Sequence, residues 1–139
     1  MVYNGLSTKG DKMGRITTTR EIDIDLTTVV AEGQLEAEDF LGWLREYYSG
    51  TVTELVLWDF TDADISQISD DGFEEIVKAS KDRDKARAWG KTAFVFDDED
   101  GYKKGKDYVS LSESRDMEFE IQVFKDMSAA RSWLGLEQK

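Results

Sequence analysis

The chain has 139 residues, 40% of them hydrophobic, and 30 acidic against 18 basic side chains give it a net charge of −12. This length suits one domain that buries about two-thirds of the surface exposed by its unfolded form, and the hydrophobic content excludes global disorder. The charge disfavours nucleic acids and anionic membranes as partners, and the absence of both Cys and His excludes disulfides, thiolate zinc sites and Ser-His-Asp triads.

Residues 1–14, MVYNGLSTKGDKMG, are polar and show no periodicity. They lack the apolar core of a signal peptide, and no apolar stretch of the chain reaches the roughly 20 residues that a membrane helix needs. We therefore expect a flexible lead-in over 1–14, one domain over 15–139, no membrane span and a cytoplasmic location, which the lack of Cys also fits.

The first part of the domain predicts two strands and a helix. Residues 15–31, RITTTREIDIDLTTVVA, are β-branched and partly alternating, with Ile22, Ile24 and Leu26 set against acids, so they indicate two strands joined by a turn. Residues 36–49 place apolar side chains on one helical face, begin with acids and precede Gly50, which is typical of a helix with a glycine stop.

The next segment, ELVLWDF at residues 54–60, is continuously apolar, as expected of a strand that is covered on both faces. A helix should follow, with Ser69 as its cap, Asp70 and Asp71 in its first turn, and apolar residues from Phe73 onward facing inward. Its basic end, KASKDRDKARAWG, suits the negative pole of the helix dipole.

The remaining elements alternate in the same way. KTAFVF predicts a buried strand, residues 101–114 a helix, EFEIQVF a strand, and Asp126 caps a last helix with Met127 and Trp133 on its apolar face. The order β, β, α, β, α, β, α, β, α predicts a single-domain α/β fold with a mixed, mostly parallel sheet of about five strands and four helices.

Acidic residues follow two of these strands, in DFTDAD and DDED, where the carboxyl ends of parallel strands bind ligands. An EF-hand with Gly101 at its sixth position would need a carboxylate where Phe96 stands, so this pattern fails. A magnesium site that uses Asp59 with Asp97 or Asp98 stays open, although a solvated acidic rim is the more common arrangement.

Three further motifs have simpler explanations than a functional site. AFVFDDEDGYKKG resembles the start of a receiver domain, but the 41 residues after Asp98 are too few for the rest of one. Gly-Lys-Thr at 90–92 is no phosphate-binding loop, because Lys85 stands where its first glycine belongs. The basic run from Lys78 to Arg87 suits an anion, but interleaved acids and the helix end explain it more simply.

The segments YYSGTVTELVLWDFTDADI, GKTAFVFDDEDGYKKGKDYVSL and FEIQVFKDMSAARSWLG resemble the SpoIIAA-like family of the STAS superfamily, over most of residues 16–135. This resemblance implies a compact α/β domain with a mixed sheet. Relatives in the superfamily are bacterial anti-sigma-factor antagonists that bind proteins and are switched by phosphorylation. The family is also grouped with the CRAL-TRIO lipid-transfer fold.

In the antagonists a strand ends in Asp, and a serine at the following helix start is phosphorylated. On this chain Asp59 matches the strand-end Asp, and ISDDGF at Ile68–Phe73 matches the helix start, with Asp70 in place of the phosphorylated serine. A carboxylate cannot accept a phosphate from a serine kinase. The match therefore implies a docking edge with a fixed charge, made of Asp59, Asp62, Asp64, Ser69, Asp70 and Asp71.

Together these patterns favour a non-enzymatic, protein-binding regulatory module of bacterial type that uses no cofactor. The alternative is a carrier of a small apolar molecule or lipid, of CRAL-TRIO type, and the third choice is a metal-assisted hydrolase at the acidic pole. Exposed Trp and Tyr side chains on an acidic domain also favour a symmetric homodimer.

Overall fold

The computed structural model describes residues 13–136. The expected lead-in over 1–14 thus falls almost wholly outside the described residues, although Met13 forms an isolated bridge with Gln34. The elements in chain order are β1 (Arg15–Glu21), η2 (Ile22–Ile24), β2 (Leu26–Gln34), α1 (Ala37–Ser49), β3 (Leu55–Asp64), α2 (Asp70–Lys81), η3 (Asp84–Arg87), β4 (Lys91–Val95), α3 (Glu99–Ser114), β5 (Glu120–Phe124) and α4 (Met127–Trp133).

The first two strands form an antiparallel hairpin in which Arg15 pairs with Glu32 and Glu21 with Leu26. The short 3-10 helix η2 makes the turn and ends at Asp25, whose φ of 53° is left-handed. Ile22 and Ile24 lie in this turn and are exposed. The alternation of these isoleucines with acids is typical of a strand, but here it falls on the turn that joins β1 to β2.

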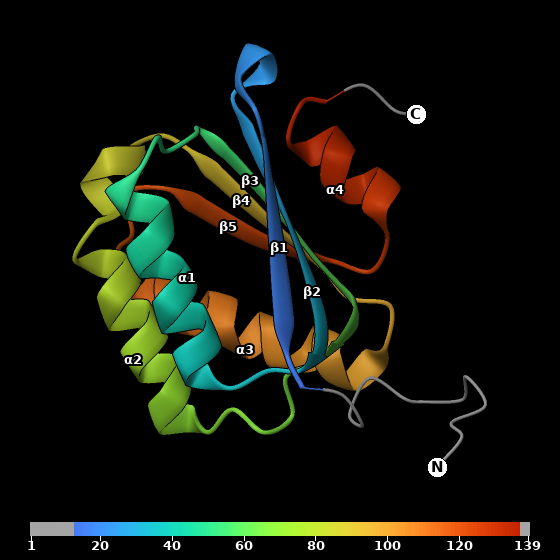
Figure 1. Ribbon diagram of the computed structural model, residues 1–139. Helices are drawn as coiled ribbons and strands as arrows, with labels where there is room; N and C mark the ends of the chain where they lie inside the picture. Colours follow the sequence, from blue (N-terminus) through green and yellow to red (C-terminus); the bar gives the residue numbers. More distant parts are fainter. Residues whose placement is uncertain (1–12, 137–139) are drawn as a thin grey trace.

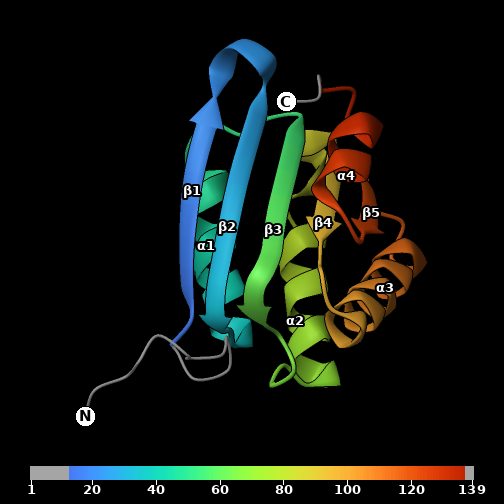
Figure 2. The same ribbon diagram turned by 90° about the vertical axis from the view of Figure 1, so that its right-hand side faces the viewer.

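The sheet has the order β1-β2-β3-β4-β5, and β2 to β5 are all parallel. Because every crossover moves one strand further in the same direction, right-handed connections put α1, α2 and α3 on the same face. Figures 1 and 2 show this layer of three helices on one side of the sheet and α4 on the other. The predicted α/β fold class, with a mixed five-stranded sheet and four helices, is confirmed.

Strand β3 is longer than predicted. It runs through Asp64, whereas the apolar pattern ended at Phe60. The pairing of β2 with β3 shifts by one residue between Val30 and Glu32, which marks a β-bulge. Beyond the bulge, the acidic stretch of β3 continues to pair with β2. The pairing to β2 therefore holds this polar segment in the sheet.

Each face of the sheet carries its own apolar core. The larger core lies under α1, α2 and α3 and includes Val29, Trp58 and Phe60. A smaller one lies under α4 and joins Leu57 and Val95 to Ala130 of the helix and to Leu134, which follows it. Burial on both faces explains the continuous apolar runs of β3 and β4. Over residues 13–136 no helix is both long and apolar enough to cross a membrane.

Candidate functional site

The six residues of the expected docking edge lie in β3 and at the start of α2. Asp59, Asp62 and Asp64 belong to β3 itself, which extends further into the acidic stretch than the sequence indicated. Asp59 Oδ1 accepts hydrogen bonds from Thr61 N at 3.0 Å and Thr61 Oγ1 at 2.7 Å, and Asp64 Oδ1 accepts one from Ser66 N at 2.8 Å. These two carboxylates thus stabilise the bulge and the turn that follows.

Ser69, Asp70 and Asp71 lie where their pattern predicted. Ser69 Oγ accepts a hydrogen bond from Gly72 N at 3.0 Å and caps α2, while Asp70 and Asp71 occupy the exposed first turn. Lys104 of α3 donates to Ile68 O at 2.8 Å and holds the preceding loop against α3. The local structure is confirmed, and the role of these residues in binding a partner stays a prediction.

The open magnesium site, which pairs Asp59 with Asp97 or Asp98, stays a prediction. No group of three or more acidic side chains within residues 13–136 is arranged to hold a metal ion. The third choice, a metal-assisted hydrolase, therefore has no centre of three or more acidic ligands in this part of the chain.

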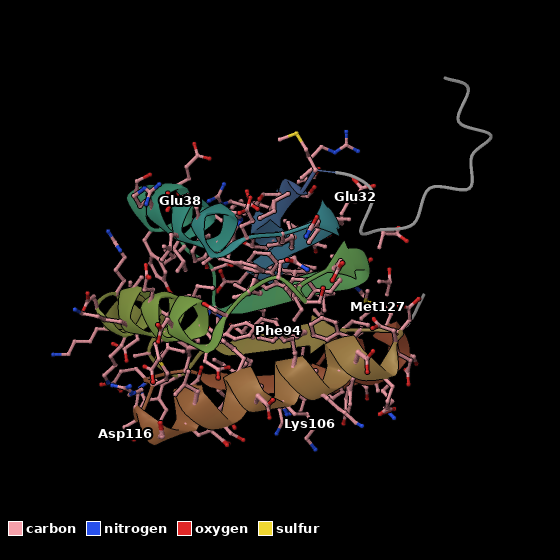
Figure 3. All side chains as sticks on the ribbon, turned by 90° about the horizontal axis from the view of Figure 1, so that it is seen from below. Glu32, Glu38, Phe94, Lys106, Asp116 and Met127 are labelled. Carbon is pink, nitrogen blue, oxygen red and sulfur yellow. The ribbon has the colours of Figure 1, made fainter. Side chains whose placement is uncertain are left out.

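A cavity of about 70 Å³ lies between the sheet and the layer formed by α1, α2 and α3. Figure 3, seen from below, shows the side chains that fill this space, with Phe94 between α2 and α3. Most of its lining is aromatic or aliphatic, contributed by Phe40, Trp43, Leu44, Tyr47, Tyr48, Val56, Trp58, Phe60, Ile65, Phe73, Ile76, Phe94, Phe96, Gly105, Tyr108, Phe119 and Ile121, with Ser80, Arg87 and Thr92 as the remaining polar residues.

Stacked rings form the apolar wall. Phe60 lies between Trp58, at 5.2 Å and 8° between ring planes, and Phe96, at 4.7 Å and 5°. Trp43 of α1 meets Trp58 edge-on at 4.8 Å and stacks on Tyr47 at 4.6 Å. Such contacts stabilise a wall beyond its buried area, by about 0.5–1.5 kcal/mol for each ring pair.

The opposite, polar end of the cavity is organised by Arg87, the last residue of η3, which is only 4% exposed. Its Nε donates to Thr53 O at 2.9 Å, its Nη1 to Thr92 Oγ1 at 2.7 Å, and its Nη2 to Glu54 O at 2.7 Å and Lys91 O at 2.9 Å. The guanidinium therefore joins the segment that precedes β3 to the start of β4. The basic run was explained as a helix end, and for Arg87 that explanation was wrong.

Two tyrosine hydroxyls share this end of the cavity. Burial raises the pKa of Tyr108 to about 12, although Ser80 and Ser112 near its hydroxyl act against the rise. Burial also raises the pKa of Tyr48, which the neighbouring Arg87 partly opposes. Both phenols therefore keep their protons at neutral pH and are available as hydrogen-bond donors.

No family model matches the chain, and no curated protein matches it. A solved structure does: an uncharacterised protein of the DUF3478 family from Shewanella loihica PV-4, described as having a SpoIIAA-like fold. The TM-score is 0.55 at 19% sequence identity, over 87% of this chain and 93% of the other. The chain therefore has a SpoIIAA-like fold, as the resemblance predicted. A likeness at this identity concerns the fold alone.

Proposed function

We propose that this domain binds a small apolar molecule between its sheet and its layer of three helices. The observation that supports this function is the aromatic-lined cavity with a few polar groups at one end, which is the usual composition of a small-molecule site. The lipid-transfer fold grouped with the family adds support as an analogy. The proposal thus prefers the second of the functions expected from the sequence.

The size of the cavity sets a condition on this function. At about 70 Å³ it has less than half the volume of the roughly 150 Å³ cavity that binds benzene in another protein. A ligand of benzene size or larger therefore enters only if lining side chains move apart. Trp43 and Tyr48 of α1 and Phe94 of β4 are partly exposed, so they are the first candidates for this movement.

The test uses neutral apolar probes and two matched variants. Benzene, indole and 1-octanol should shift the amide resonances of residues that line the cavity, among them Gly105. Val56→Phe adds bulk to the buried cavity wall and should abolish these shifts, whereas Val30→Phe, on the opposite face of β2, should leave them. If none of the probes shifts any lining residue of the folded protein, the proposed function is wrong.

We propose protein binding through the start of α2 as a second function. Asp70 and Asp71 are exposed in the first turn of α2, with no ion pair to another described residue, so they present negative charge to a basic partner surface. The double variant Asp70→Asn and Asp71→Asn should lose a partner captured by the unaltered protein. Asp107→Asn on the exposed side of α3 should keep it. Equal capture by both variants would contradict this function.

Both functions are proposed for a cytoplasmic protein without catalytic activity. The proposal assigns no reaction to the acids of β3. A calorimetric titration with magnesium or manganese should give no binding heat. Heat that disappears in Asp59→Asn would reopen the hydrolase alternative.

The predicted homodimer has a better candidate contact than exposed aromatic side chains. Of the four Trp residues, all of which are described, Trp89 alone is exposed. Strand β1, in contrast, lies at the edge of the sheet and pairs with β2 on one side only. Antiparallel pairing of two β1 strands about Thr18 would set Arg15 opposite Glu21 of the second copy. Light scattering should show a dimer. Arg15→Glu should disrupt it, and the double variant Arg15→Glu with Glu21→Arg should restore it. A monomeric mass at micromolar concentration would contradict the dimer.

A further inference from the structure

The guanidinium of Arg87 carries a buried charge without a carboxylate partner. Four of its five N–H donors bind neutral oxygens, three of them main-chain carbonyls. Within residues 13–136 no acidic side chain forms an ion pair with it, and its ring contact, Phe119 at 4.6 Å, is also neutral. Buried charges are normally paired, so this end of the cavity favours an anion.

The nearest acidic residue on the same element does not fill this role. Asp84 is 3% exposed, but its Oδ2 accepts from Lys81 Nζ at 3.0 Å and from Glu118 N at 3.0 Å. The negative charge of Asp84 and the positive charge of Lys81 therefore compensate each other. One positive charge is left at the cavity, on Arg87.

The hydroxyl of Tyr48 faces the guanidinium on the cavity side. Arg87 donates a hydrogen bond to this hydroxyl, which keeps its own proton for a further partner. Tyr48 also lies near Tyr108 and within electrostatic reach of Asp84. Both phenols stay protonated at neutral pH. A carboxylate has about four acceptor positions and suits a guanidinium flanked by hydroxyls.

The rest of the cavity suits an apolar body. Val56, Trp58 and Phe60 line it from β3, and the four residue steps from the first to the last extend about 13 Å along the strand. The polar groups Arg87 and Thr92 lie toward the amino ends of the strands, and Phe60 and Phe96 lie toward the carboxyl ends. The cavity thus changes from polar to apolar along its length.

We infer that the ligand is an amphiphilic monocarboxylic acid, with its carboxylate at Arg87 and Tyr48 and its apolar body along Trp58 and Phe60. This inference rests on the proposed apolar-ligand function and adds the chemical class of the ligand. A neutral alcohol would leave the charge of Arg87 unpaired. A phosphate group, with up to two charges, would exceed the one uncompensated cation of this end of the cavity.

The experiment compares acids with alcohols that have the same body. Octanoate and 1-octanol, and benzoate and benzyl alcohol, are titrated at pH 7 while the fluorescence of Trp43 and Trp58, which both line the cavity, is recorded. Each acid should bind at least about tenfold more tightly than its alcohol, as one charge-assisted contact implies. Tyr48→Phe should reduce this ratio several-fold, whereas Tyr102→Phe, outside the cavity, should preserve it.

Arg87→Met tests the charge directly, because the acid-to-alcohol ratio should fall to about one. Should this variant not fold, the acid-to-alcohol ratios of the unaltered protein and of Tyr48→Phe decide whether a carboxylate is bound. If alcohols bind as tightly as acids to the unaltered protein, the carboxylate inference is overturned while the apolar-ligand function stands. If neither acid nor alcohol binds, the proposed function fails as well. A ratio that Tyr48→Phe and a folded Arg87→Met both leave unchanged would place the acid elsewhere and also overturn the inference.

Discussion

The buried hydroxyl pair of Thr27 and Thr53 offers a sharp test of the packing beside the cavity. The side chains are 0% and 2% exposed, and their Oγ1 atoms are 2.7 Å apart. Thr53 Oγ1 donates its one proton to Leu55 O at 2.8 Å, so Thr27 must be the donor in the pair. The main-chain oxygen of Thr53 also accepts a hydrogen bond from the hydroxyl of Tyr47, at 3.1 Å.

Replacement of either threonine by valine keeps the shape and removes one hydroxyl. Thr53→Val leaves the buried Thr27 hydroxyl without an acceptor and should lower the free energy of unfolding by about 1–3 kcal/mol. Thr27→Val removes only a donor and should cost about 0.5–1.5 kcal/mol. In the double variant neither hydroxyl remains unpaired, so its loss should be smaller than the sum by at least about 0.5 kcal/mol.

Urea unfolding followed by circular dichroism measures all four proteins. With a denaturant slope of about 2 kcal/mol/M, a loss of about 2 kcal/mol moves the midpoint by about 1 M. The slope should not change, because valine alters no surface that unfolding exposes. Additive losses within about 0.3 kcal/mol, or a loss for Thr53→Val below that value, would refute the hydrogen-bond assignment.

Four further predictions concern α1, α2 and α3. Gly105→Ala should destabilise the fold by about 1–3 kcal/mol, because its Cβ would lie 2.7 Å from Phe96 Cε2. Gly42→Ala in α1, with its nearest neighbouring atom 3.7 Å away, should stabilise it by about 0.5–1 kcal/mol in the same unfolding assay. Ser69→Ala should cost about 1 kcal/mol through loss of the α2 cap, and an unchanged urea midpoint would contradict that role. The raised pKa of Tyr108 means that the unfolded chain releases this proton first, so stability should fall between about pH 10 and pH 12, and Tyr108→Phe should flatten that fall.

Local chemistry made the elements predictable from the sequence. Ser69 and Asp126 cap helices by accepting from Gly72 N and Ala129 N, as their positions before apolar runs indicated. The apolar runs of β3 and β4 followed from burial on both faces. The extension of β3 through Asp64 was missed because a bulge and pairing to β2 hold polar residues that have little strand propensity of their own.

The candidate site depended on information that the sequence does not carry. The acids at the carboxyl ends of the strands suggested a crevice, but such a crevice forms where the strand order reverses, and this sheet has no reversal. The cavity lies instead between the sheet and the layer of α1, α2 and α3, and it collects aromatic residues from both. The sequence feature that could have indicated the cavity is the spacing of aromatic residues two positions apart, as in Trp58 with Phe60 and Phe94 with Phe96. An ordinary hydrophobic core gives the same pattern. Arg87 was missed because its run of charges looks solvated.

The sequential strand order also has a consequence for how the chain folds. Each new strand of the sheet pairs with the strand that precedes it, so no pairing waits for a later segment of the chain. The sheet can thus grow vectorially from the hairpin of β1 and β2 during synthesis, with one helix docking after each added strand. The cavity closes last, since Tyr108, Phe119 and Ile121 come from α3, the segment before β5, and β5 itself. A nascent chain that ends before α3 has the wall of stacked rings on β3 and lacks the side chains that close over it.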